Sequence, residues 1–86
     1  MTSARKMALK YVLKTEKALK RLKTMSSPVH IEVSLVKEVI EEAERYFKDA
    51  KYYLERKEYL ISLASITYCE GLLDALRMLH LIKLDW

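Results

Sequence analysis

Glycine and proline are almost absent from this 86-residue chain, which contains one of each, Gly71 and Pro28. The many tight turns of a β-sandwich or barrel depend on such residues, because they adopt backbone conformations that other residues avoid. Apolar residues make up 51% of the chain, which is too many for a disordered protein. The sequence therefore predicts an all-α fold in a single domain, residues 1–86.

A first helix is predicted from about residue 3 to residue 25. Thr2 or Ser3 would cap its start, and the sequence SSP at 26–28 would end it. Small and apolar side chains recur every three or four residues along it and form one stripe, which faces a core. The stripe consists of Ala8, Tyr11, Val12, Thr15, Ala18, Leu19, Leu22 and Met25.

A second helix is predicted at about 33–55, where apolar residues alternate at spacings of four and three, as in the contact seam of a coiled coil. Its start has two candidates. Ser27 could cap the helix with Pro28 at the first helical position, or the helix could begin near Val33 after a short extended segment. We favour the start near Val33.

A third helix is predicted at about 59–83, after a tight turn around Lys57. A short connection makes the second and third helices antiparallel neighbours, and the first is expected to pack across them in a three-helix bundle. Leucine is so frequent in the third helix that one face cannot hold it, so the helix must be covered on several sides, either by the two neighbouring helices alone or by these helices with a second subunit. Trp86 is expected either to complete the core or to join an interface.

Gly71 lies inside the third helix, where glycine costs roughly 1 kcal/mol relative to alanine. With the turn centred on Lys57, Gly71 is predicted to face Ala43, and Ala64 to face Ala50. We expect Gly71 to be a contact notch that lets the two backbones approach closely, so that leucine there would strongly lower the melting temperature. The alternative is a slot that is open to a ligand or partner.

Polar side chains form one line along the third helix, because they recur three or four residues apart. They are Thr67, Glu70, Asp74, Arg77 and His80. The expected explanation is a solvated edge. The alternative is a binding site in which tyrosine hydroxyls donate to carboxylates, and its candidate residues are Glu70, Gly71, Asp74, Tyr46, Asp49 and Tyr68.

No catalytic constellation is found, so the chain is not expected to be an enzyme. Cys69 and His80 are separated on one helix by roughly 16 Å, too far for a nucleophile and its base. Cys69 is expected to be a buried small hydrophobe. Neither Glu70 nor Asp74 has a histidine three or four residues away, as di-iron helices require, so we expect no metal and no cofactor.

The cellular setting is suggested by composition. A single cysteine and an N-terminus without the apolar core of a signal peptide favour the cytoplasm. Glu70, Asp74, Arg77 and Lys83 interrupt the most apolar segment, so we expect no run of about 18 apolar residues and no membrane association. Asparagine and glutamine are both absent, which favours a heat-adapted organism.

Charge is distributed unevenly, because residues 1–27 carry a net charge of +7 and residues 28–86 carry −3. A basic stripe lies opposite the apolar stripe of the first helix and consists of Lys6, Lys10, Lys14, Lys17 and Arg21. We expect this helix to dock against the acidic run at 37–44. The alternatives are weak, sequence-independent binding to nucleic-acid phosphates and attraction to an anionic membrane.

A family resemblance is carried by residues 43–79, AERYFKDAKYYLERKEYLISLASITYCEGLLDALRML. They resemble the archaeal domain-of-unknown-function family 357, in which an Ala-x-x-Tyr-x-x-Asp-Ala helix and a Gly-Asp-Tyr-like turn precede Ser-Tyr-x-x-Gly-Leu-Leu-Asp-Ala. The chain departs from this pattern at ERKE, residues 55–58, and at Cys69. The resemblance implies a small helical bundle from an archaeon and no catalytic residues. The matching residues are Tyr46, Asp49, Ala50, Tyr68, Gly71, Leu72, Asp74 and Ala75.

Two broader likenesses bear on function. The predicted hairpin resembles the helix pairs of tetratricopeptide-like and vesicle-trafficking modules, which bind helices or peptides in a groove. It is less similar to toxin-system ribonucleases, because Arg77 and His80 are too close in sequence for their Arg-x4-6-His motif. We therefore expect a non-enzymatic protein-interaction module whose partner is another protein or a second copy. The alternative is an accessory protein that binds nucleic-acid phosphates.

Overall fold

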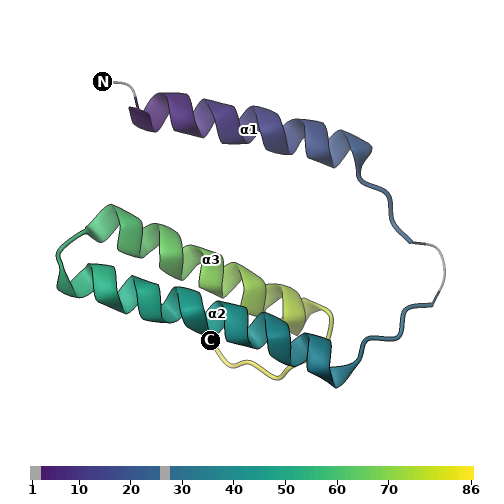
Figure 1. The fold of residues 1–86 in the computed structure, drawn as a ribbon. Helices are drawn as coiled ribbons and strands as arrows, with labels where there is room; N and C mark the ends of the chain where they lie inside the picture. The colour runs from purple at the N-terminus through teal and green to yellow at the C-terminus, as the bar shows by residue number, and fades with distance from the viewer. Residues whose placement is uncertain (1–2, 26–27) are drawn as a thin grey trace.

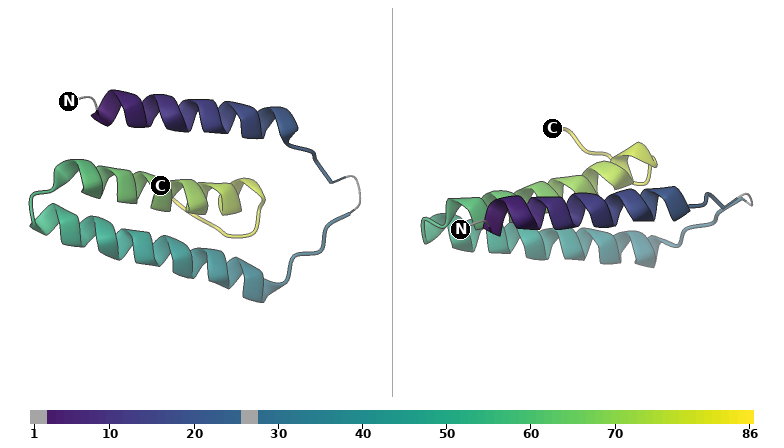
Figure 2. Two further views of the ribbon diagram at one scale, coloured as in Figure 1. Left: turned by 45° about the horizontal axis from the view of Figure 1, so that its top comes forward. Right: turned by 90° about the horizontal axis from the view of Figure 1, so that it is seen from above.

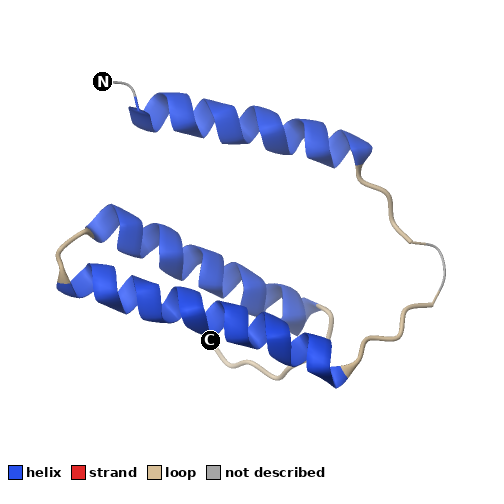
Figure 3. Cartoon of the chain, in the orientation of Figure 1, coloured by secondary structure: helices blue, strands red, loops and turns tan. Residues whose placement is uncertain are grey.

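Three α-helices make up the regular structure, and no strand occurs in residues 3–25 and 28–86, which the computed structural model describes. α1 comprises Ser3–Arg21, α2 comprises Val33–Glu55 and α3 comprises Tyr59–Met78. Figures 1 and 3 show α2 and α3 side by side and antiparallel, joined by a tight turn, with α1 at the end of a longer connection. The prediction of an all-α chain with a hairpin of the second and third helices is confirmed.

The predicted helix starts agree with the structure, but two of the predicted ends do not. α2 begins at Val33, as we favoured, after an extended Glu32. α1 ends at Arg21 rather than near residue 25, because nothing packs against its last turn and an unsupported helix end frays. The capping candidates Thr2 and Ser27 lie outside the described residues.

The turn between α2 and α3 is a Schellman motif centred on Lys57, whose φ is 64°. The Lys57 N–H donates to the Leu54 carbonyl at 3.0 Å, and the Glu58 N–H donates to the Tyr53 carbonyl at 2.9 Å. These bonds satisfy carbonyls that the end of α2 would otherwise leave unpaired. The turn therefore lies where the sequence predicted it, although a lysine takes the place usually held by glycine.

The same motif ends α3 at Met78, earlier than predicted, because His80 adopts a φ of 60°. The His80 N–H donates to the Arg77 carbonyl at 2.9 Å, and the Leu81 N–H donates to the Leu76 carbonyl at 3.0 Å. A left-handed residue cannot continue a right-handed helix. The C-terminal segment consequently turns back along the hairpin (Figure 1).

The core is a narrow contact between α2 and α3. On α2 the buried side chains are Ala43, 1% exposed, and Ala50. On α3 they are Ser62, Cys69 and Leu76, spaced at intervals of seven. The Ser62 hydroxyl donates to the Ala50 carbonyl at 2.7 Å, so a serine, not Ala64, meets Ala50. Half-buried neighbours flank this line: Val36, Val39, Ile40, Tyr46 and Tyr53 on α2, and Ser65, Ile66, Leu72 and Leu73 on α3.

Gly71 does not face Ala43, so the predicted contact notch is wrong. Gly71 is exposed, and a Cβ built on it would meet no atom within 4 Å. Ala43 instead lines a hollow with Cys69 and Leu73. The turn position sets which residues lie at the same level of a hairpin, but it does not set the rotation of a helix about its axis. Position 71 is two residues from Cys69, which is about 200° around the helix.

α1 stands apart from the hairpin, contrary to the expected packing of the first helix across it (Figure 2). No Cα atom of α1 lies within 8 Å of a Cα atom of α2 or α3, and α1 has no buried residue. The expectation relied on the apolar stripe of the first helix, which shows that a surface needs cover but not which surface supplies it, and on attraction between exposed charges, which contributes about 1 kcal/mol or less per pair and does not fix an orientation. Glu42 in the acidic run instead pairs with Arg45 of its own helix.

α3 is apolar enough, over Tyr59–Met78, to cross a membrane by length and composition. The expectation that charges would prevent this was wrong, because an 18-residue window from Tyr59 contains only Glu70 and Asp74 as charged residues. Core helices of soluble proteins pass the same test, so the finding by itself assigns no membrane. Here 17% of the window is buried, which means that most of α3 is left uncovered.

Candidate functional site

The side of α3 that points away from α2 carries a second line of residues at helix-contact spacing. We call it the outer seam, and it consists of Leu60, Ala64, Thr67, Gly71, Asp74 and Met78. Its spacings alternate between four and three, as in the seam between two packed helices. Leu60 is 84% exposed and Met78 is 65% exposed. The outer seam therefore has the pattern of a helix contact with no helix on it among the described residues.

A shallow groove of about 570 Å³ lies at the centre of the outer seam. Its lining brings together three of the predicted site residues, Glu70, Gly71 and Asp74, with Thr67 and Trp86. Trp86 is 66% exposed, so the C-terminal segment forms a wall of the groove and does not complete the core. The missing side chain of Gly71 leaves the floor of the groove open.

Polar groups in the groove are largely engaged within α3. Arg77 donates to the Asp74 carboxylate, with its Nε 2.8 Å away and a second nitrogen 2.7 Å away. The Thr67 hydroxyl donates to the Ala64 carbonyl at 3.0 Å. Glu70 and Arg77 lie along this edge of α3, where they can form ion pairs at the rim of an interface.

The predicted tyrosines are not part of this groove. Tyr46 and Tyr68 pack edge to face, with ring centroids 4.4 Å apart, on the flank of α3 opposite Glu70. Asp49 is exposed on α2 and does not line the groove. Within the described residues, no tyrosine hydroxyl donates to Glu70 or Asp74. The structure thus splits the predicted site into an acidic groove and a separate tyrosine pair.

Cys69 is buried in the hairpin contact, as expected, and lies away from the groove. Burial, and secondly the negative charge of Glu70, raise the pKa of its thiol. A raised pKa lowers the thiolate fraction, which makes the thiol less nucleophilic at neutral pH. In the described part of the chain, no group of three or more histidine, cysteine or acidic residues could hold a metal ion.

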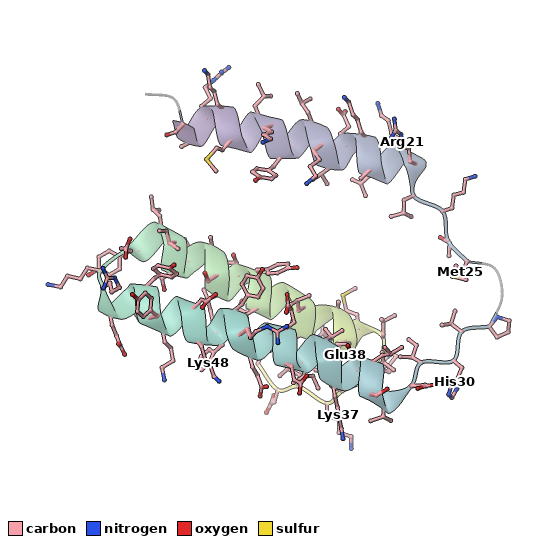
Figure 4. The ribbon with its side chains drawn as sticks, viewed as in Figure 1. Arg21, Met25, His30, Lys37, Glu38 and Lys48 are labelled. Atoms are coloured by element: carbon pink, nitrogen blue, oxygen red, sulfur yellow. The ribbon has the colours of Figure 1, made fainter. Side chains whose placement is uncertain are left out.

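The basic stripe of α1 is exposed along its whole length. Figure 4 shows Arg21 at the end of α1 and Glu38 on α2, in separate parts of the molecule. The Nζ atoms of Lys10 and Lys14 lie 5.8 and 5.7 Å from the ring centroid of Tyr11, a cation–π arrangement. The other members of the stripe, Lys6, Lys17 and Arg21, are also exposed.

The apolar stripe of α1 is equally uncovered. Part of it lines a shallow hollow of about 640 Å³ that includes Tyr11, Val12, Thr15 and Leu19. Leu19 and Leu22 are exposed to a similar extent, at 64% and 65%. α1 therefore presents two unpartnered surfaces, one apolar and one basic.

Comparison with known proteins gives one match. The model of a family described as "Protein of unknown function (DUF357)" matches residues 10–82. None of the curated proteins and none of the solved structures matches the chain. The matched region includes most of α1 as well as the whole hairpin.

Proposed function

We propose, since the chain belongs to the DUF357 family of unknown function, that it is a non-enzymatic protein-interaction module which binds an amphipathic helix along the outer seam of α3. The observation that carries this proposal is the exposure of a line at helix-contact spacing on the side of α3 opposite the core. A helix face that exposes Leu60, Ala64 and Met78 along one line is costly to leave in water and marks an interaction site.

The chemistry of the outer seam specifies what would bind. Ala64, Thr67 and Gly71 are short, so a bound helix can approach the backbone of α3 closely. Leu60 and Met78 lie at the two ends and would pack against apolar residues of the bound helix. Glu70 at the edge of the groove favours a partner with basic residues beside its apolar stripe.

Affinity capture with Gly71→Leu tests this proposal. The full-length wild type, Gly71→Leu and a control, Lys48→Leu on the exposed side of α2, are immobilised and exposed to nuclease-treated lysate of the source organism. We expect a protein with an amphipathic helix, a category that includes another copy of this chain, to be retained by the wild type and the control, and to be lost with Gly71→Leu. That protein, identified by mass spectrometry and purified, must bind again alone. Equal retention by all three variants would contradict the proposal.

A second candidate function, the binding of nucleic-acid phosphates, is favoured by the exposure of the basic stripe of α1. Phosphate binding weakens linearly in log salt concentration, with a slope set by the number of phosphates neutralised. The test measures retention on immobilised nucleic acid across a salt series. Charge reversal of Lys6, Lys10, Lys14 and Lys17 to Glu is expected to abolish retention, whereas a slope near zero for the wild type would exclude this function.

A further inference from the structure

α1 needs a partner in order to be a stable helix. It has 19 residues and none of them is buried. Most of the stability of a helix in a protein comes from tertiary packing of its amphipathic face, and α1 has no such packing on α2 or α3. The charges of α1 make the problem worse, because Lys6, Lys10 and Lys14 follow one another at intervals of four, a spacing at which like charges repel. Its stability must therefore come from packing of its apolar stripe on another surface.

The chain exposes far more surface than a compact protein of its size. Its accessible surface is 8010 Å², whereas a folded monomer of 10.2 kDa exposes about 5,300 Å². Its radius of gyration is 16.0 Å, compared with about 12 Å for a compact domain of this length. The excess is about 2,700 Å² per chain, or about 5,400 Å² for two chains, which is at the upper end of the total area that an obligate dimer buries.

The two uncovered faces match each other in pattern and charge. α1 carries a seam at alternating spacings of three and four, Ala8, Tyr11, Thr15 and Ala18, which Leu22 continues directly after the helix ends, and this spacing complements that of the outer seam. Residues 1–27 carry a net charge of +7, and residues 28–86, which include the hairpin, carry −3. α3 itself carries Glu70 and Asp74 against Arg77, a net charge of −1, so the apolar pattern is what favours contact between α1 and α3, and the opposite charges add to it.

We propose that two copies of the chain exchange their first helices, so that α1 of each copy packs along the outer seam of its partner's α3. This inference rests on the proposed function and names the helix that binds. The chain's own α1 stands apart from its hairpin, with no Cα atoms of α2 or α3 within 8 Å, so its apolar stripe is available to another copy. Reciprocal exchange forms the helix contact twice, and each copy supplies the cover that the other lacks.

The first test is the oligomeric state of the full-length protein, measured by size-exclusion chromatography with light scattering over a range of concentrations. We expect a mass twice the 10.2 kDa of one chain. Gly71→Leu places a bulky side chain in the middle of the contact and is expected to weaken association at least about tenfold. Its hairpin should keep its helical content, because no atom lies within 4 Å of a Cβ at this position. Lys48→Leu is the control that should remain a dimer.

The second test distinguishes exchange from other dimers by disulfide cross-linking in a Cys69→Ser background. Thr15 and Thr67 lie near the middle of the α1 seam and of the outer seam, so they are brought together whichever way the helices run. One chain carries Thr15→Cys and another carries Thr67→Cys. After mixing and oxidation, we expect a covalent dimer that contains one chain of each kind. A dimer that does not form this cross-link overturns the exchange.

A chain with both substitutions, Thr15→Cys and Thr67→Cys, tests whether α1 closes on its own hairpin. Exchange predicts a covalent dimer, whereas closure within one chain gives an internal disulfide in a species of 10.2 kDa. The internal disulfide, or a monomer at all concentrations, overturns this inference. Either result leaves the proposed function standing if capture through the outer seam still succeeds. Loss of capture together with a monomer overturns both.

Discussion

Lys57 and His80 hold the left-handed backbone conformation that usually belongs to glycine after the end of a helix. A side chain in that conformation costs about 1–2 kcal/mol, because its Cβ approaches the following carbonyl oxygen. Both residues are held there by the paired backbone bonds that end α2 and α3. The backbone is therefore strained at two positions, and a substitution to glycine at either position relieves the strain there.

Lys57→Gly is therefore expected to raise the free energy of unfolding by about 0.5–1 kcal/mol, since relief of strain exceeds the extra flexibility of glycine in the unfolded chain. Urea denaturation measures the change. The matched control is Lys51→Gly, an exposed position inside α2, which should lower the free energy of unfolding by about 1 kcal/mol. A loss of stability in both variants would show that Lys57 is not strained.

Cys69 makes the stability of the hairpin depend on pH. Its thiol has a raised pKa in the folded protein because of burial and the charge of Glu70. A group whose pKa is higher in the folded state stabilises that state below its unfolded pKa and loses this effect as pH rises through the folded value. We expect the wild type to lose more stability than Cys69→Ala on going from neutral to alkaline pH. Parallel curves for the two proteins in chemical denaturation would contradict this expectation.

At the level of the helices, periodicity predicted where each element begins, but it predicted the rotation of α2 much better than that of α3. On α2 a single apolar stripe through Ala43 and Ala50 identified the face that meets α3, and the structure buries both alanines, although Phe47 and Leu54 of the same stripe remain exposed. On α3 apolar residues lie all round, so several faces were compatible with burial. Gly71 was assigned to the contact with α2 because it is small. In the structure, Ser62 and Cys69 are the small residues of α3 that are buried in this contact.

Only part of the candidate site was predicted correctly, because the rotation of α3 about its axis could not be predicted from the sequence. The three-four spacing correctly placed Glu70 and Asp74 on one edge of α3, because that spacing depends only on helix geometry. The tyrosines were assigned to the same site because they were expected to cluster near Glu70 and Asp74 in the hairpin, but the rotation of α3 places Tyr68 on the other flank. The place of Trp86 in the groove depends on the left-handed residue His80, which no sequence signal marked.

Ala43 lies at the closest part of the contact between α2 and α3, where it is 1% exposed. Ala43→Leu is expected to lower the free energy of unfolding by about 1–3 kcal/mol, because the added atoms force the helices apart. Lys48→Leu adds similar bulk on the exposed side of α2 and should change stability by about 0.5 kcal/mol or less. Similar effects of the two substitutions on thermal unfolding would indicate that the helices do not meet at Ala43.

At the level of the whole molecule, the position of α1 was the feature that the sequence predicted least well. Its basic and apolar stripes were both evident, but a stripe indicates only that a surface requires a partner, not which surface that partner supplies. The hairpin offers acidic residues on α2 and an apolar face on α3. Which of these two surfaces α1 contacts depends on how the helices are arranged relative to one another, and the pattern within a single helix does not determine that arrangement.

A dimer built by exchange makes thermal unfolding depend on concentration, because unfolding then separates two chains. For two chains of 86 residues, a tenfold increase in protein concentration should raise the melting temperature by about 4 °C. Differential scanning calorimetry of the full-length protein measures this shift. A melting temperature that stays constant over a hundredfold range would show that the folded unit is one chain.

The connection between α1 and α2 gives the protein an accessible cleavage point. Lys23 and its described neighbours in this connection are exposed and outside any helix, which is the state that proteases cut most readily. Trypsin acting there would divide the protein into a basic peptide and an intact hairpin without cutting a packed helix. Whether the two fragments then elute together would depend on helix contacts alone, because the covalent link would be gone.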